Sequence, residues 1–239
     1  MKCVLKICYD GSMFCGMQSQ NSGCSVEDKI KKALKSIGID SKIEYAGRTD
    51  RGVHALGQVV SFELPIYWDS TEKLKNELSK NLAPYIIIRR IFFTDDTFHA
   101  RFSAKKREYI YIINPTAQLP FYNNYILQEE LDVQKIKSAI PHFIGRYDFE
   151  YFMLMGSEPS NTIREVYSAS IYKHRGVYII SFCANGFLRS QVRLMVGFLL
   201  QISRGVLSEE DLVRQLNKDH LIFRKPISPS GLYLKSIYY

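Results

Sequence analysis

The sequence lacks several features that would place it in a special class of protein. None of its apolar runs approaches the roughly 18 residues that a membrane-spanning helix requires. It has no low-complexity segment, and none of its five cysteines belongs to a C-x-x-C pair. An odd number of scattered cysteines fits neither a zinc site nor a disulfide framework, so we expect reduced, mostly buried side chains. The cysteines are Cys3, Cys8, Cys15, Cys24 and Cys183.

The first residues, MKCVLKICYDG, also lack the features of a secretory signal. Lys6 interrupts the apolar stretch, and no small-residue cleavage site follows it. With 239 residues, of which 46% are hydrophobic, the chain is typical of a globular protein with one large domain or two small ones. We therefore expect a soluble protein of the cytoplasm.

Acidic residues are fewer than basic ones. The chain carries 32 lysines and arginines against 24 aspartates and glutamates, a formal net charge of +8. This balance suits a polyanionic partner, although many basic proteins bind no nucleic acid. The 16 tyrosines and 14 phenylalanines could add rings on which unpaired bases stack, while most of them should lie in the core.

The first half of the chain predicts the element order β-α-β-β-α-β. Ser25 and Asp28 form a helix-start signal, and apolar residues then recur at helical spacing until Gly38. Asp69 with Glu72 opens a second helix. The predicted helices cover 26–37 and 69–82, and the predicted strands cover 3–9, 43–46, 58–64 and 85–93, the last of them buried on both faces.

The second half repeats this order, which predicts an α+β fold of two tandem ferredoxin-like units with a cleft between them. Asp132 and Ser208 are the expected helix starts, and HRG joins two strands as a hairpin. The predicted division is 1–95, a cleft-lining connection at 96–106, and 107–239. The predicted strands cover 107–113, 165–173, 177–184 and 232–238, and the predicted helices cover 132–144, a segment from 192 to 202, and a segment from 208.

The loop GRTDRGVH, between two strands of the first half, concentrates the charged residues. Glycines at 47 and 52 allow a tight path around Asp50, and a guanidinium within about 4–6 Å favours an ionised carboxylate. Such a carboxylate can act as a nucleophile or a base. From spacing alone, Asp50 could equally cap a turn, and His54 is more often a structural histidine than a catalyst.

Five blocks of the sequence resemble the tRNA pseudouridine synthase A family. The resemblance covers essentially the whole chain and agrees with the tandem ferredoxin-like prediction. The matching blocks are YDGS-x-F-x-G-x-Q at 9–18, AGRTD-x-GVHA-x-GQVV-x-F at 46–62, FHARFSA-x-x-R-x-Y at 98–109, NGFLRSQVRLMVG at 185–197 and SGLYL at 230–234.

The resemblance implies an isomerase and assigns roles to four residues. Asp50 matches the essential aspartate, and Arg48 matches the arginine that intrudes beside a flipped nucleotide. Tyr109 matches the tyrosine that stacks on the target base, and Arg193 matches the arginine that pairs with the catalytic acid. Extrusion of a base requires a group to fill the gap and a ring to receive the base. The implied reaction needs neither a cofactor nor a metal.

The implied substrate is tRNA, with uridines at tRNA positions 38, 39 and 40 of the anticodon stem-loop as targets. The resemblance also implies a homodimer whose RNA groove spans both subunits. Basic residues near the expected cleft segments are candidates for contact with RNA phosphates. They are Arg51, Arg101, Lys105, Lys106, Arg107 and Arg189, together with Arg89 and Arg90.

Three departures from the family pattern bear on the shape of the RNA groove. Arg51 stands where alanine is common, and Met17 stands where tryptophan is usual. Ser190-Gln191 replaces a commoner His-Met pair. All four residues with assigned roles remain.

Two other classes of function stay open on the residues alone. A ferredoxin-like sheet with basic and aromatic residues could be an RNA-binding module without activity. Asp50 and His54 could also serve a hydrolase, which ordinarily needs a metal or a second carboxylate. No convincing second carboxylate is present, because Glu44 and Glu63 occupy predicted strand positions.

Overall fold

A computed structural model describes residues 1–116, 119–156 and 161–239. The chain divides into two compact units. Unit 1 comprises Met1–Lys105 and Tyr233–Tyr239, and unit 2 comprises Lys106–Leu232. The last strand thus groups mainly with unit 1, whereas the sequence-based division kept it with the second half. The boundaries of that division stay a prediction.

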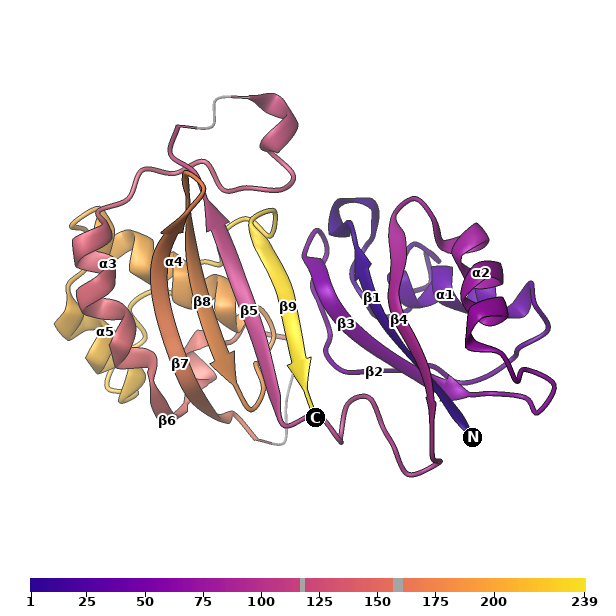
Figure 1. Cartoon of the computed structure of the whole chain (residues 1–239). Coiled ribbons are helices and arrows are strands. Elements are labelled where there is room, and N and C mark those ends of the chain that lie inside the picture. Colours follow the sequence, from indigo (N-terminus) through magenta and orange to yellow (C-terminus); the bar gives the residue numbers. More distant parts are fainter. Residues whose placement is uncertain (117–118, 157–160) are drawn as a thin grey trace. The chain divides into compact units, whose positions relative to one another are not determined.

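Unit 1 has the strand order of a ferredoxin-like sheet. Strands β4, β1 and β3 are antiparallel neighbours, and β2 and β9 both pair with β3, the former antiparallel and the latter parallel. The predicted β-α-β-β-α-β order is confirmed (Figure 1). The elements are β1 (Lys2–Tyr9), α1 (Val26–Lys35), β2 (Glu44–Tyr45), β3 (His54–Glu63), α2 (Thr71–Leu82), β4 (Ile86–Thr94) and β9 (Leu232–Tyr238).

The two helices of unit 1 begin at side-chain caps. The Ser25–Asp28 capping box at the start of α1 is confirmed, and α1 buries Ile30 and Leu34. The cap of α2 is Ser70, whose hydroxyl accepts from the N–H of Lys73, so the prediction of a start at Asp69 was one residue early.

Strand β4 is only half-buried, which corrects the prediction of a strand buried on both faces. Ile86 and Ile88 are buried, whereas Ile87 is 57% exposed and Arg89 and Arg90 are exposed. The reason is topological, since β4 lies at an edge and α2 packs on one of its faces. The run of isoleucines therefore spans both a covered and an open face.

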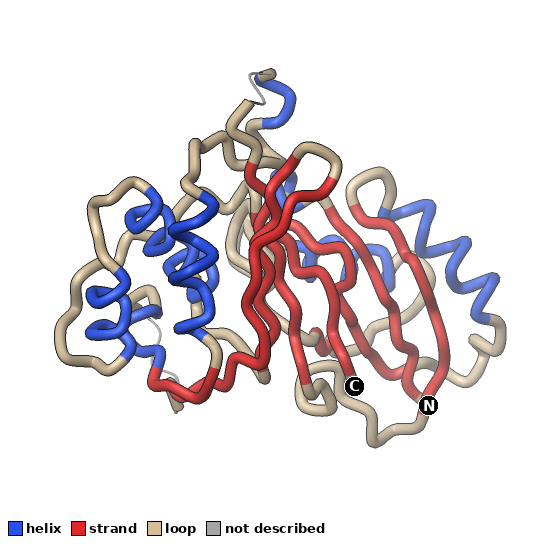
Figure 2. The backbone as a smooth tube through the Cα atoms, turned by 60° about the vertical axis from the view of Figure 1, so that its left-hand side comes forward, coloured by secondary structure: helices blue, strands red, loops and turns tan. Residues whose placement is uncertain are grey.

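Unit 2 contains an antiparallel sheet in the order β5-β8-β7-β6, with its helices gathered on one side of the strands (Figure 2). Strand β6 was not predicted. Helix α3 ends earlier than expected, because the chain tightens into a 3-10 turn that contains Pro141. The elements are β5 (Lys106–Ile113), α3 (Val133–Ala139), β6 (Gly145–Asp148), β7 (Ile163–His174), β8 (Val177–Ala184), α4 (Gln191–Ser203) and α5 (Glu209–Leu216), with 3-10 turns at Pro120–Tyr122, Ile140–Phe143 and Phe149–Phe152. A further 3-10 turn, at Gly11–Met13, belongs to unit 1.

Aromatic rings fill the core of unit 2. Phe143 lies edge-on to Phe152 and Phe182, with ring centroids 5.4 and 5.8 Å apart, and Phe152 also contacts Phe198 of α4. All four rings are fully buried. Helix α4 is nearly all buried, so its apolar character reflects a central position. Within the described residues, no helix is long and apolar enough to cross a membrane.

The cysteines correct the expectation that all of them are reduced. Cys15 and Cys24 form a disulfide, with Cα atoms 5.6 Å apart. The N–H of Cys15 donates to the carbonyl of Cys24 at 3.0 Å, so the loop before α1 returns on itself. Sequence spacing alone cannot show this return. Cys3, Cys8 and Cys183 are free thiols.

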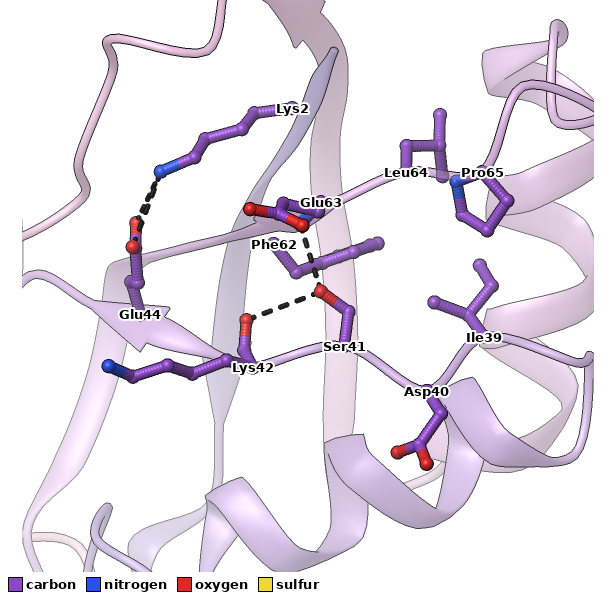
Figure 3. Close-up of a pocket in the computed structure, with 10 residues that line it drawn as sticks. All are labelled: Lys2, Ile39, Asp40, Ser41, Lys42, Glu44, Phe62, Glu63, Leu64 and Pro65. Carbon is purple, nitrogen blue, oxygen red and sulfur yellow. Dashed lines mark hydrogen bonds and ion pairs between the residues drawn. The ribbon is translucent and has the colours of Figure 1, made fainter.

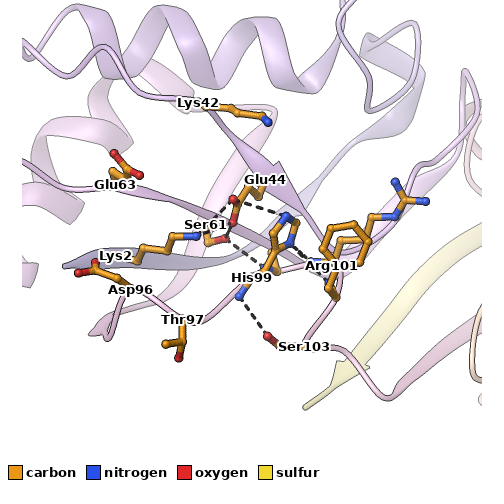
Figure 4. Close-up of polar contacts among 12 residues, drawn as sticks. Lys2, Lys42, Glu44, Ser61, Glu63, Asp96, Thr97, His99, Arg101 and Ser103 are labelled. Carbon is orange, nitrogen blue, oxygen red and sulfur yellow. Dashed lines mark hydrogen bonds and ion pairs between the residues drawn. The ribbon is translucent and has the colours of Figure 1, made fainter.

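Side-chain contacts hold the two-residue strand β2 in the sheet of unit 1. The carboxylate of Glu44 accepts from Lys2 Nζ of β1 at 3.1 and 3.2 Å and from Ser61 Oγ of β3 at 2.9 Å (Figure 4). Partial burial by itself would raise the pKa of Glu44. The hydrogen bonds from Lys2 and Ser61, with the charges of His99 and Lys2, outweigh burial and hold this pKa below its ordinary value of 4.5.

We expect Glu44→Gln to lower the free energy of unfolding by about 1–2 kcal/mol near neutral pH, because hydrogen bonds to a charged group are the stronger ones. The pKa of the folded state lies below the unfolded value. The stabilisation is therefore complete above about pH 4.5 and is lost as the pH falls through the folded pKa. Urea unfolding of both proteins across this range measures the difference.

The exposed neighbour Glu63, which faces Lys2 in the strand register, supplies the matched control. Glu63→Gln should change the unfolding free energy little at any pH, because exposed ion pairs contribute little. A loss for Glu44→Gln that stays constant from neutral to acid pH would contradict the assigned role of the carboxylate.

Candidate active site

Asp50 lies in the loop that joins β2 to β3 of unit 1. Its side chain is half-buried, the preceding Thr49 is buried, and Arg48 and Arg51 on either side are exposed. The loop turns at Gly52, which has a φ of 78°, a value that glycine adopts without steric cost. The structure thus presents a partly accessible carboxylate between two exposed cations.

Hydrogen bonds from the sheet and from the loop after β1 fix the path of this loop. Tyr9 Oη lies 2.8 Å from Thr49 Oγ1, and the N–H of Met17 donates to the carbonyl of Thr49 at 3.1 Å. Gln58 Nε2 donates to the carbonyl of Gly47 at 2.7 Å. Burial raises the pKa of Tyr9 to about 12, so its hydroxyl stays protonated in this network.

Two glycines of the block at 9–18 allow the backbones to approach closely. A β-carbon at Gly11 would lie 2.1 Å from the carbonyl oxygen of Val53. One at Gly16, where φ is +106°, would lie 2.8 Å from the carbonyl oxygen of Thr49. Real β-carbons do not come this close to backbone atoms, so both positions require glycine. The backbone of this block therefore packs directly against the Asp50 loop and supports it.

His54 is a structural residue of this support. It is 2% exposed, and its ring stacks on Tyr233 with centroids 4.7 Å apart. Its Nδ1 accepts from the N–H of Gly11 at 3.0 Å, so Nδ1 carries no proton in that arrangement. Asp10 Oδ1 lies 3.4 Å from the same nitrogen. The geometry favours the structural reading of His54 over a role as the catalytic partner of Asp50 in a hydrolase.

The side chain of Arg48 contacts Tyr45 at the end of β2. The Tyr45 hydroxyl is half-buried, which raises its pKa; the hydrogen bond from Arg48 and the charges of Arg48 and Arg101 act in the opposite direction. Arg101 was predicted from sequence only as a phosphate contact. In the structure its charge acts on the same phenol to which Arg48 is hydrogen-bonded.

In unit 2, Tyr109 lies on β5 opposite Phe182 of β8. Its ring is 7% exposed and meets the ring of Phe187 edge-on, with centroids 5.2 Å apart. Phe187 belongs to the block at 185–197 but drew no attention in the sequence, because an aromatic residue before a helix is usually core. The contact holds the ring of Tyr109 in one orientation.

Arg193 lies on α4 near the same face of β5. Its Nε donates to the carbonyl of Ile227 at 2.8 Å. Burial raises the pKa of Tyr111 above its usual range, while the nearby charge of Arg193 acts to lower it. Tyr109 and Tyr111 are two residues apart on one strand and share a face. Unit 2 therefore gathers Arg193 and Tyr109 on one side of β5.

The block SGLYL has a packing role here. The Tyr111 hydroxyl donates to the carbonyl of Ser228. A β-carbon at Gly231 would lie 2.6 Å from the ring of Tyr111 and 2.7 Å from the carbonyl oxygen of Ile112. Glycine at 231 therefore lets the chain lie directly against β5.

The predicted phosphate contacts divide between the two units. Arg51, Arg101 and Lys105 belong to unit 1 and are exposed. In unit 2, Lys106 Nζ lies 5.1 Å from the centroid of the Tyr167 ring, and Arg107 donates to the carbonyl of Asn185 at 2.8 Å. Arg189 is exposed and donates to the carbonyl of Met155 at 3.3 Å. Their contact with RNA stays a prediction.

Two of the departures from the family pattern are buried. Met17 is fully buried, beneath the Asp50 loop. Gln191 is 1% exposed and its Oε1 accepts from the N–H of Leu188 at 2.8 Å, while Ser190 has a left-handed backbone with a φ of 57°. These buried side chains therefore help to set the conformation of the Asp50 loop and of the loop before α4. Arg51 is the exposed departure.

A pocket of about 380 Å³ lies at the opposite end of β3 from Asp50 (Figure 3). It is lined by residues such as Phe62, Glu63 and Ser41, whereas Asp50 precedes the start of the strand at His54. Ten extended residues span on the order of 30 Å. The pocket is therefore separate from the candidate active site.

The chain was compared with family models, solved structures and curated proteins. A family model described as tRNA pseudouridine synthase matches residues 139–239. Among solved structures, a Cbf5-Nop10-Gar1 complex superposes with a TM-score of 0.39 at 14% identity, covering 83% of this chain and 45% of that one.

Curated relatives named tRNA pseudouridine synthase A match nearly the whole chain. The protein of Wolinella succinogenes is 40% identical over 95% of this chain and 90% of its own length. That of Helicobacter hepaticus is 40% identical over 98% and 97%, and that of Campylobacter jejuni is 37% identical over the full length of both. This identity over the full length confirms the resemblance and the pseudouridine synthase fold: the chain belongs to the tRNA pseudouridine synthase A family.

Proposed function

We propose that Asp50 is the catalytic carboxylate with which this tRNA pseudouridine synthase converts uridine to pseudouridine at tRNA positions 38, 39 and 40. The family relationship establishes the isomerisation of uridine in tRNA. In that reaction the N1–C1′ bond breaks, the uracil turns, and C5 bonds to C1′; C5 then loses its proton and N1 gains one. Asp50 supplies the carboxylate that initiates this isomerisation.

The fixed path of the Asp50 loop is the observation that carries the proposal. Thr49 and Val53 on either side of Asp50 are buried, and their carbonyls lie against Met17 and Gly11. The segment between them, residues 50–52, reaches solvent. A reacting group must be held within about 0.5 Å of its productive position, and this support provides such precision.

Three further residues have proposed roles. Arg48, exposed beside Asp50, occupies the space that a flipped nucleotide leaves in the RNA. Tyr109, held edge-on by Phe187, receives the target base. Arg193 pairs with the catalytic carboxylate. The bond from its Nε to the Ile227 carbonyl, at 2.8 Å, anchors the guanidinium on α4.

The proposal extends to the assembly and its setting. The family resemblance favours a homodimer acting on the anticodon stem-loop in the cytoplasm. Sedimentation of the pure protein tests the dimer. The net charge of +8 supports binding of a polyanion by the monomer as well as by the dimer.

Asp50→Ala should abolish tritium release from tRNA labelled at uridine C5. We expect a fall of at least about 100-fold, because loss of a group that acts directly in proton transfer or bond formation costs this much or more. Asp40→Ala is the matched control, since Asp40 is an 85% exposed aspartate of the same unit. It should retain wild-type release.

Absence of release by the wild-type protein, or equal release by Asp50→Ala, would refute the proposed chemistry. Repeating the assay on tRNAs that lack uridine at position 38, 39 or 40 in turn tests the proposed targets. Unchanged release after removal of all three uridines would refute that part.

Binding of tRNA should weaken steeply with salt. If six of the predicted phosphate contacts engage RNA, affinity should fall on the order of 1000-fold between about 50 and 200 mM salt. The six are Arg51, Arg101, Lys105, Lys106, Arg107 and Arg189. Arg189→Ala should reduce the slope of log affinity against log salt by about 1. Filter binding with intact tRNA measures both effects.

Arg146→Ala serves as the control for charge alone, because Arg146 is an exposed arginine of β6 outside the predicted set. The slope of log affinity against log salt for Arg146→Ala should equal that of the wild type. A flat salt response, or equal slopes for Arg189→Ala and wild type, would argue against phosphate contact at these positions.

A further inference from the structure

Residues 99–103 of unit 1 form a tight turn beside β2 and β3, held by hydrogen bonds within the turn (Figure 4). The N–H of Ser103 donates to the carbonyl of His99 at 2.9 Å, and the N–H of His99 donates to Ser103 Oγ at 3.0 Å. His99 Nδ1 accepts from the N–H of Arg101 at 3.1 Å. These bonds fix the backbone that carries the next two side chains.

Phe102 at the tip of this turn is 75% exposed. The ring of His99 lies against it, with centroids 4.3 Å apart, and the guanidinium of Arg101 lies 5.5 Å from its centre. A single exposed phenylalanine needs no explanation in general. Here the ring is held on a rigid turn beside two nitrogen-rich groups, an arrangement that suits a base and its phosphate.

We propose that the 99–103 turn is a second nucleotide-binding site, which takes a nucleotide of the tRNA other than the reacting uridine. The base stacks on Phe102, and Arg101 contacts the phosphate of the same nucleotide. This proposal rests on the proposed function, since it concerns the same RNA. Charge favours RNA as the occupant: Arg101 beside the ring and Lys105, three residues after Phe102 along the chain, are both exposed, and the chain has a net charge of +8.

The turn is attached to the sheet through Ser61 and Glu44. The N–H of Ala100 donates to Ser61 Oγ at 3.2 Å, and the Ser61 hydroxyl donates in turn to Glu44 at 2.9 Å. Glu44 Oε1 also lies 3.5 Å from His99 Nε2. On the other side, Tyr239 Oη donates to the carbonyl of Ala100 at 2.8 Å. Ser61 is fully buried, so these contacts are well shielded from water.

Glu44 is thus a positioning residue for the proposed site. It holds the imidazole of His99, against which Phe102 packs, and it holds the hydroxyl that receives the Ala100 amide. It has no contact with RNA in this arrangement. Loss of its charge should release the turn without altering Phe102 or Arg101 chemically.

The test compares Phe102→Ala with Phe121→Ala. Phe121 is a matched control because it is 78% exposed and lies in unit 2, outside every site described above. We expect Phe102→Ala to weaken tRNA binding by about 5- to 100-fold, the effect of losing one stacked base, and Phe102→Trp to restore it. Phe121→Ala should stay within about 2-fold of wild type.

Binding is measured with intact tRNA in the Asp50→Ala background, and the KM for tritium release is measured with active enzyme. The KM should rise for Phe102→Ala while kcat at saturating tRNA is retained. Equal affinities for Phe102→Ala and wild type would overturn the proposed site. So would equal losses in the Phe102→Ala and Phe121→Ala proteins.

A double-mutant cycle tests the role of Glu44. Glu44→Gln should weaken binding when Phe102 is present and have little further effect in the Phe102→Ala protein, because the two act as one unit. A merely structural role would weaken binding equally in both backgrounds and would overturn the positioning. Melting temperatures of all variants separate this effect from unfolding.

Failure of this inference is distinguishable from failure of the proposed function. Tritium release by the wild type with unchanged binding by Phe102→Ala defeats only the second site. Absence of release defeats the proposed chemistry, and the binding comparison then still decides whether Phe102 contacts RNA.

Discussion

The close approach of Gly11 to the carbonyl of Val53 is the constraint on which the candidate active site depends. It brings the loop after β1 against the loop before β3, and the amide of Gly11 then reaches the buried imidazole of His54. Gly16 repeats the approach at Thr49. Between these two contacts the chain has one short segment with access to solvent, residues 50–52, which begins with Asp50.

Local signals made most of the fold predictable from sequence. The capping boxes at Ser25 and Ser208 and the strand predicted at 58–64 depend on residues a few positions apart, and the structure contains each of them, although β3 is buried on both faces rather than on one. The predictions that were wrong concern features that depend on distant parts of the chain. The exposure of Ile87 follows from the edge position of β4, and the Cys15–Cys24 disulfide follows from a loop that folds back.

The residues proposed for the site come from the sequence motif, whereas their surroundings could not be predicted from it. The motif identified Asp50, whereas spacing alone left it as a possible turn cap and left His54 as a catalytic candidate. Only the structure shows His54 buried beneath the loop and Arg48 bonded to Tyr45. Phe187 and Phe102 were not predicted as site residues, because a sequence does not show which rings are exposed or which groups they contact in space. In the structure Phe187 lies beside Tyr109, and the ring of Phe102 lies beside the guanidinium of Arg101.

The Asp50 loop is held by main-chain atoms, chiefly the carbonyls of Gly47, Thr49 and Val53. Side chains at the exposed positions of the loop therefore do not determine its course. Residue 51 can change from a small apolar type to arginine while the aspartate beside it keeps its place. The charge that the loop presents can therefore vary during evolution while the backbone around Asp50 keeps its path.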